Sequence, residues 1–157
     1  MSQRSAAHTS FVLERRLKAS PARVFHAWAD LEAKRQWADC HAEVGTLEYS
    51  MDFRPGGREI HRATLPDGKL QLVEKVFLEI VADARIIFAY AMEAGGRHLS
   101  ASLVTVEFHA EGTGTRLQLT EQLVYLDGHN DLEERIGGTG EGLDRLVLTL
   151  AEELPTA

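Results

Sequence analysis

The most constraining feature of this sequence is a hydrophobic period that changes twice. From about Val44 to Tyr125, apolar residues recur at every second position, as in Tyr49, Met51 and Phe53. On either side of this stretch, they recur at steps of three and four. Period two is typical of strands with one buried face, and steps of three and four are typical of amphipathic helices. The sequence therefore predicts an antiparallel sheet between helical segments.

Turn residues divide the central stretch into separate strands. Pro66, Asp67 and Gly68 predict a hairpin turn, because proline presets φ and glycine accepts a positive φ. A short segment of apolar and polar residues before the first helix, FVLERRLK, predicts one more strand. The expected strands cover residues 11–18, 47–53, 58–65, 70–81, 85–93, 99–109 and 115–125.

Capping residues mark two short helices after the first strand. Ser20 is the expected N-cap of one helix, with Pro21 at its first position, and Asp30 is the expected N-cap of a second helix over residues 31–37. A long amphipathic helix is predicted from Leu132 to Leu154. Its first half contains four glycines, each costing roughly 1 kcal/mol relative to alanine. Either an interaction offsets this cost or the helix begins later.

Length and charge limit the class of protein. A chain of 157 residues suits one domain, which we expect at residues 10–157 after a flexible N-terminus at 1–9. With 17 basic and 24 acidic residues and no basic run longer than two, we expect no nucleic-acid partner. We expect no membrane span, because no apolar run is long enough. A single cysteine and the polar N-terminal sequence favour the cytoplasm.

Several segments occur in an order that resembles a known family. The order of elements resembles the helix-grip fold of the Bet v 1/START-like (SRPBCC) superfamily. Within it, the segments resemble the activator of the ninety-kilodalton heat-shock protein ATPase, in its small bacterial stand-alone form, over about residues 10–154. They are ASPARVFHAWAD with Trp37, DFRPGGR, PDGK, VFLEIVADARIIFAY, SLVTVEFHAEGTGTRLQLTEQ and GEGLDRLVLTL. The resemblance implies an α+β fold of about six to seven strands, with the last helix across the concave face.

Two departures from the family pattern remove bulk. Family members often carry an aromatic residue just after the tryptophan, where this chain has Ala38. They also carry an aromatic residue early in the last helix, where this chain has Gly137, Gly138 and Thr139. Both positions are expected to border the interior, so the departures favour a cavity between sheet and helix.

A bent sheet beneath a glycine-rich helix suggests a pocket for a small, mostly apolar molecule. Gly138 and Gly142 lie four residues apart and therefore on one face of the helix. The alternative is a filled core beneath a loosely formed helix start. The expected inward residues also include Leu47, Leu72, Val76 and Leu117. The expected ligand-binding residues are Tyr49, Met51, Phe53, Phe88, Tyr90, Val104, Val106, Leu119, Gly138 and Gly142.

Three titratable residues are candidates for chemistry in this pocket. Glu74 and Glu121 share the apolar phase of their strands, where burial would raise a carboxyl pKa and allow general acid–base catalysis or ligand anchoring. The alternative is that a bulge or strand end turns each carboxylate to solvent, or that a neighbouring arginine pairs with it. The strand holding His61 has two equally plausible phases, with Glu59 and His61 or Ile60 and Arg62 inward.

No metal or cofactor is expected. Cys40 and His41 are adjacent and lack the spacing of metal ligands or of an activated nucleophile. The glycine-rich run from Gly137 lacks the lysine and the preceding strand of a phosphate loop.

Three functions remain, in order of preference. The first is binding of a small apolar molecule, and the second is docking on a chaperone or another protein, as the resemblance implies. The third is a cyclase- or dehydratase-type enzyme, which would need Glu121, Glu74, Tyr90 or His61 to converge. A homodimer is also possible, because an edge strand of the sheet must be covered.

Overall fold

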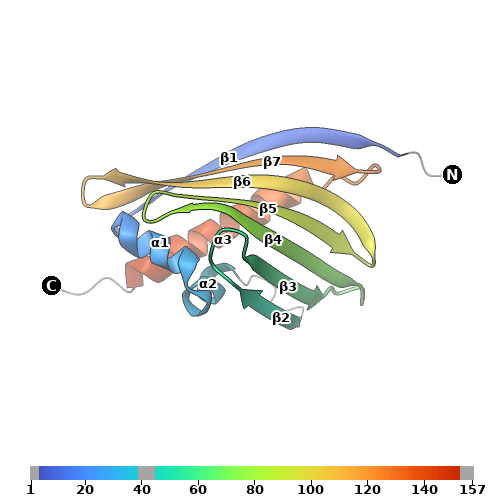
Figure 1. Ribbon diagram of the computed structural model, residues 1–157, viewed down its shortest axis with the longest axis horizontal. Coiled ribbons are helices and arrows are strands. Elements are labelled where there is room, and N and C mark those ends of the chain that lie inside the picture. Colours follow the sequence, from blue (N-terminus) through green and yellow to red (C-terminus); the bar gives the residue numbers. More distant parts are fainter. Residues whose placement is uncertain (1–3, 39–44, 153–157) are drawn as a thin grey trace.

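A computed structural model describes residues 4–38 and 45–152 and shows one antiparallel sheet with three helices (Figure 1). The strand order is β1-β7-β6-β5-β4-β3-β2, and every neighbouring pair is antiparallel. The helices α1 and α2 follow the first strand, and α3 runs diagonally across the sheet. The predicted helix-grip α+β fold is confirmed. The elements are β1 Ala6–Leu17, α1 Pro21–Ala29, α2 Leu31–Ala38, β2 Thr46–Met51, β3 Arg58–Thr64, β4 Leu70–Val81, β5 Arg85–Ala94, β6 Arg97–Glu111, β7 Gly114–Leu126 and α3 Leu132–Glu152.

The local signals for turns and caps act as expected. Ser20 Oγ accepts a hydrogen bond from the Arg23 amide at 3.3 Å, and Asp30 Oδ2 accepts one from Ala33 at 3.0 Å. These bonds satisfy amides that the first turn of a helix leaves unpaired. Gly68 has a φ of +86°, which the hairpin between β3 and β4 requires.

Two predicted boundaries need correction, and one alternative is excluded. The first strand begins at Ala6, so residues 6–9, expected in a flexible N-terminus, pair with β7. The strand expected over residues 47–53 ends at Met51. The helix α3 begins at Leu132 and continues through all four of its glycines, so the later start is wrong. Val44, where the alternating pattern begins, and Leu154, the predicted end of the last helix, lie outside the described residues.

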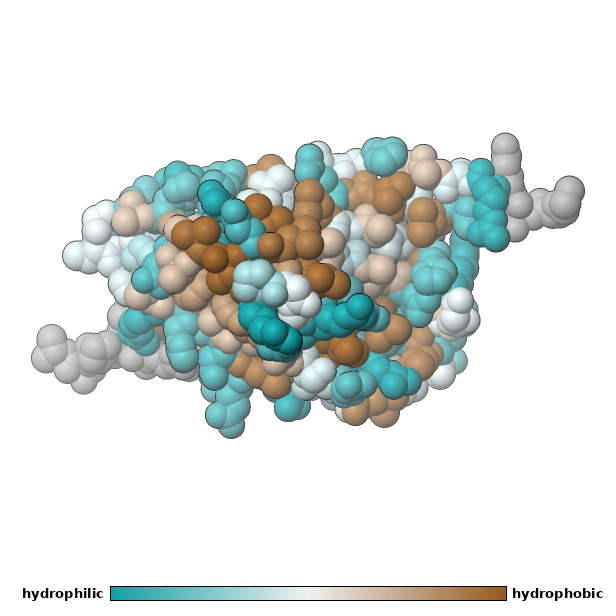
Figure 2. Space-filling model, viewed as in Figure 1, coloured by the Kyte–Doolittle hydropathy of each residue, from teal (hydrophilic) through white to brown (hydrophobic). Residues whose placement is uncertain are grey.

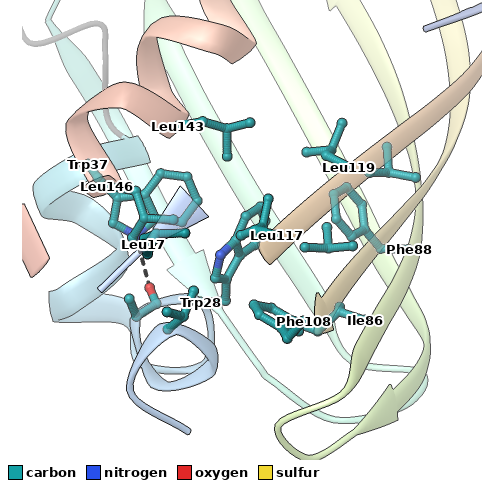
Figure 3. Close-up of a cluster of buried hydrophobic side chains, with 14 of the residues drawn as sticks. Leu17, Trp28, Trp37, Ile86, Phe88, Phe108, Leu117, Leu119, Leu143 and Leu146 are labelled. Carbon is teal, nitrogen blue, oxygen red and sulfur yellow. Dashed lines mark hydrogen bonds between the residues drawn. The ribbon is translucent and has the colours of Figure 1, made fainter. Parts of the chain in front are cut away.

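The core fills one part of the concave side of the sheet. Trp28 and Trp37 come from α1 and α2, with ring centroids 4.6 Å apart, and Trp37 Nε1 donates to the carbonyl oxygen of Ala27 at 3.0 Å (Figure 3). Leu143 and Leu146 reach down from α3 toward these rings. Removing these side chains from water stabilises the fold by about 1.5–3 kcal/mol for each large apolar residue. The rest of the concave side is not filled in this way.

Candidate functional site

A cavity of about 410 Å³ lies between the sheet and the first half of α3. This volume falls in the range of small-molecule pockets. Its apolar wall comes from both tryptophans and from β4, β5, β6 and β7, whereas α3 contributes several small residues. The apolar and small lining residues are Trp28, Trp37, Ala38, Val73, Phe88, Met92, Val104, Leu119, Gly138, Thr139, Gly142 and Leu143.

The small residues on α3 leave this space open. A Cβ added at Gly138 would meet no atom within 4 Å, so packing within the protein does not require glycine there. A Cβ at Gly142 would make only ordinary contacts, at 3.7 Å with Arg145 and 3.8 Å with Trp37. Ala38 and Thr139 also line the cavity. The two positions where the chain departs from the family pattern are therefore both in the cavity wall.

One group of buried charges lies where α2 approaches β3 and β4. Lys34 Nζ is 2.5 Å from Glu59 Oε1, and the side chains of both residues are 2% exposed. Lys75 Nζ approaches the other oxygen of Glu59 at 3.4 Å, and Tyr49 donates to it at 2.9 Å. Lys34 also lies over the rings of Trp28 and of a second aromatic residue, Phe77.

This environment shifts the pKa values of the first group. Burial lowers the pKa of Lys34 to about 8, an effect that the nearby Glu59 carboxylate reduces. Burial alone would raise the pKa of Glu59, but the charges of Lys34 and Lys75 outweigh it and lower the pKa to about 2. Both residues are therefore charged at neutral pH.

A second group of buried charges lies where α3 begins above β5, β6 and β7. Glu121 Oε2 accepts hydrogen bonds from Tyr90 at 2.6 Å, from Ser102 at 2.8 Å and from Arg135 at 3.5 Å. Arg135 also pairs with Asp131 at 3.1 Å. Burial and the Glu121 charge together raise the pKa of Tyr90, so its hydroxyl remains a proton donor.

The structure brings only part of the predicted site together. Phe88, Tyr90, Val104, Leu119, Gly138, Gly142 and Glu121 line the main cavity. Tyr49 and His61 line an adjoining pocket of about 150 Å³, whose wall shares Ala38, Gln71, Val73, Lys75 and Met92 with the main cavity. Glu59 and His61 are therefore the inward pair of their strand.

Other predicted residues lie outside the cavity wall. Val106 and Leu117 are fully buried in the core, and Met51 and Phe53 are partly buried residues that pack against the core cluster. Leu47 is 62% exposed. Leu72, with Glu74, lines a pocket on the opposite face of the sheet.

The phase predicted for β4 is wrong for Leu72 and Val76, and a β-bulge separates these residues from Ile80, which does pack against the core. The pairing of β4 with β5 shifts between Phe77 and Glu79, so residues before and after this point alternate in opposite senses. Gln71, Val73 and Lys75 face the cavity. Glu74 lies on the other face, where Arg58 pairs with it. Val76, directly opposite Arg58 in the register, has the same phase as Glu74 and is not in the cavity wall.

Sequence reasoning missed several polar residues of the cavity. Lys34, Gln71, Lys75, Arg135 and Arg145 all line it. A partial signal existed for Lys34, which shares a helix with Trp37 at a spacing of three. No comparable signal marks Lys75, because the apolar residues beside it indicate the opposite phase.

The described residues form neither a cluster of metal ligands nor a membrane-spanning helix. Residues 4–38 and 45–152 contain no group of three or more His, Cys, Asp or Glu side chains that could hold a metal ion. Cys40 and His41 lie outside the described residues. In the same part of the chain, no helix is both long and apolar enough to cross a membrane.

A curved seven-stranded antiparallel sheet, two short helices after the first strand and a long helix across the concave face define the helix-grip class of the Bet v 1/START-like superfamily. The family model described as "Activator of Hsp90 ATPase homolog 1-like protein" matches residues 18–154. The chain belongs to this family.

Solved structures of bacterial proteins agree with this assignment. A putative uncharacterized protein from Rhizobium leguminosarum is 50% identical, with 96% of this chain and 99% of that chain covered and a TM-score of 0.90. A protein from Rhizobium loti is 40% identical over 92% of this chain and 98% of its own, with a TM-score of 0.86. A Chromobacterium violaceum protein, 20% identical over 89% and 95% of the two chains with a TM-score of 0.69, shares the fold. No curated protein matches the chain significantly.

Proposed function

We propose that this protein binds a small, mostly apolar molecule in the cavity between the sheet and α3. The observation that carries the proposal is the unfilled space of about 410 Å³ between the sheet and α3. Its wall is mostly apolar, with Trp28, Phe88 and Leu119 among the side chains that face it. A pocket of this size and lining suits a small apolar molecule.

The lining supports binding more than catalysis. Of the two acids considered for acid–base chemistry, Glu74 lies on the outer face and pairs with Arg58, so it is remote from the cavity. Glu121 is held by three hydrogen bonds to one oxygen. We therefore assign Glu121 to the structure of the cavity wall and propose no reaction.

A filled-cavity variant tests the proposal. Trp28 and Trp37 are the chain's two tryptophans, and both line the cavity, so their fluorescence reports its occupancy. With decanol as the apolar probe, we expect saturable binding to the wild type and at least tenfold weaker binding to Gly138→Phe. Gly137→Phe is the matched control, because a Cβ at Gly137 also meets nothing but this residue does not line the cavity.

Two results would overturn the proposal. One is equal decanol affinity in Gly138→Phe and the wild type, which would show that the probe binds elsewhere. The other is no saturable binding of decanol by the wild type.

A second candidate function, docking on a partner protein, is favoured by the outer face of the sheet. Figure 2 shows apolar side chains gathered over the strands. Exposed apolar residues include Val12 on β1, Leu78 on β4 and Leu103 on β6. Exposed apolar patches of this kind often mark protein interaction sites. If this candidate is correct, Leu78→Lys with Leu103→Lys should abolish co-purification of a partner from the native host, whereas Gly138→Phe should leave it unchanged.

A further inference from the structure

The polar side chains of the cavity floor form one row across the middle of the sheet. In the antiparallel registers, Glu59 on β3 is opposite Lys75 on β4, Lys75 is opposite Tyr90 on β5, and Tyr90 is opposite Ser102 on β6. Glu121 completes the row through its bonds to Tyr90 and Ser102. A molecule in the cavity therefore lies against a polar strip as well as apolar walls.

Formal charge is unevenly distributed along this row. At the β3 and β4 end, the two ammonium groups of Lys34 and Lys75 share the single carboxylate of Glu59. At the other end, the guanidinium of Arg135 lies between the carboxylates of Glu121 and Asp131. The first end has one positive charge in excess, and the second has one negative charge in excess when His129, whose Nε2 is 3.0 Å from Asp131, is neutral. Unbalanced charges in a desolvated site favour a ligand of opposite charge.

Of the two lysines that share Glu59, Lys75 makes the weaker ion pair. Its Nζ is 3.4 Å from the Glu59 carboxylate, whereas Lys34 Nζ is at 2.5 Å. Its side chain is 21% exposed, compared with 2% for Lys34. The ammonium also lies 5.0 Å from the centre of the Phe88 ring, which is part of the apolar wall. Lys75 therefore presents a charged donor beside an apolar surface.

Gln71 adds an unsatisfied polar group to the same wall. It precedes Lys75 by four residues on β4, so both face the cavity. Its side-chain oxygen is buried without a hydrogen-bond partner among residues 4–38 and 45–152, and its nitrogen makes only a 3.9 Å approach to Met92 Sδ. A half turn of the amide exchanges the two atoms, so Gln71 can offer a ligand either a donor or an acceptor.

At the opposite end of the row, the excess carboxylates already have donors. Glu121 accepts from Tyr90, Ser102 and Arg135 through one oxygen. Asp131 accepts from Tyr125 at 2.7 Å and pairs with Arg135. These donors stabilise both carboxylates. A cationic group of a ligand would therefore gain less by binding at this end of the row than an anionic group would gain by binding at Lys75.

We infer that the molecule bound in this cavity is an apolar monocarboxylate, with its carboxylate at Lys75 and its hydrocarbon body against Phe88, Val104 and Leu119. One charge in excess at this end of the row matches a monoanion rather than a dianion such as a phosphate monoester. This inference rests on the proposed function, because it names the class of molecule that the cavity takes.

A set of probes with one hydrocarbon chain and different head groups tests the inference. Decanoate, decanol and decylamine are titrated against the wild type by tryptophan fluorescence. A charge-assisted hydrogen bond is about twice as strong as a neutral one, so decanoate should bind roughly tenfold or more tightly than decanol. Lys75→Met should remove this preference, bringing the ratio of decanoate to decanol affinity to about one. If Lys75→Met does not fold, Lys75→Gln removes the same charge and keeps a polar side chain.

Two controls locate the effect. Lys69→Met removes an exposed lysine at the hairpin before β4 and should keep the full preference for decanoate. Arg145→Met tests the competing cation, whose Nη2 is buried without a hydrogen-bond partner in the described part of the chain. Arg145 is half-buried and already donates to Trp37 through Nε at 3.0 Å, so its loss should leave the preference in place.

Each contrary outcome has a separate meaning. Equal binding of decanoate and decanol by the wild type overturns the inference and leaves the proposed function intact. Tighter binding of decylamine than of decanoate would have the same meaning. The same holds if the preference for decanoate is lost in Arg145→Met but kept in Lys75→Met. If decanol itself does not bind, the proposed function fails, and the inference fails with it.

Discussion

Lys75 and Tyr90 lie directly opposite each other on β4 and β5, and together they connect two groups of buried charges. Lys75 pairs with Glu59 on one side, and Tyr90 donates to Glu121 on the other. The polar row therefore crosses the sheet floor without a break between strands. Because its members are largely desolvated, the stability of the fold should depend strongly on keeping each charge paired.

Replacing Glu59 by glutamine should destabilise the protein strongly. The substitution removes the only acid in the Lys34, Glu59 and Lys75 group among the described residues and leaves two ammonium groups together. Breaking a buried pair in this way costs about 3–5 kcal/mol. Urea unfolding measures the effect. Glu74→Gln is the matched control on the outer face and should cost less than about 1 kcal/mol, as exposed pairs do. Equal losses in both variants would contradict the account.

Glu59 should also make stability sensitive to acid. Its pKa is about 2 in the folded protein, below its unfolded value of 4.5, so its contribution is fully present above pH 4.5. As the pH falls from 4.5 toward 2, the unfolded chain takes up the proton first and this contribution is lost. Unfolding free energy should therefore fall less steeply in Glu59→Gln than in the wild type across this interval. Parallel curves would show that Glu59 is not shifted.

Arg135 should matter more to folding than Arg145, although both belong to α3 and line the cavity. The side chain of Arg135 is 4% exposed and pairs with Glu121 and Asp131, so Arg135→Met leaves these carboxylates without their cation. We expect a loss of about 3–5 kcal/mol. Arg145→Met should cost roughly 1 kcal/mol, the contribution of its bond to a backbone oxygen. Thermal and urea unfolding of the two variants would reveal a reversed order if the assignment is wrong.

The sequence predicted the elements well because their signals are local. Alternation, caps and turn glycines act within a few residues, so β4 was predicted with both of its boundaries and α2 with its Asp30 cap. The face of β4 was predicted wrongly because Leu72 and Val76 are apolar on the outside, while Gln71 and Lys75 are polar on the inside. The bulge near Phe77 adds to this difficulty, since it reverses the alternation without a distinctive residue.

The candidate site was only half predictable for a related reason. Gly138 and Gly142 could be assigned to the cavity from their spacing on one helix. The group formed by Lys34, Glu59 and Lys75 depends on how α2 packs on β3 and β4, which are far apart from it in sequence. Only the register between strands shows that these charges meet, and register is a property of the folded sheet.

Native mass spectrometry of the protein purified from its own host tests the central claim most directly. The account predicts a population heavier than the 17.4 kDa chain by the mass of one small molecule. Denaturation should release this molecule, and negative-ion analysis should identify it as an apolar carboxylic acid. The added mass should be absent from Gly138→Phe and retained in Gly137→Phe. The same added mass in Gly138→Phe as in the wild type would contradict binding in the cavity.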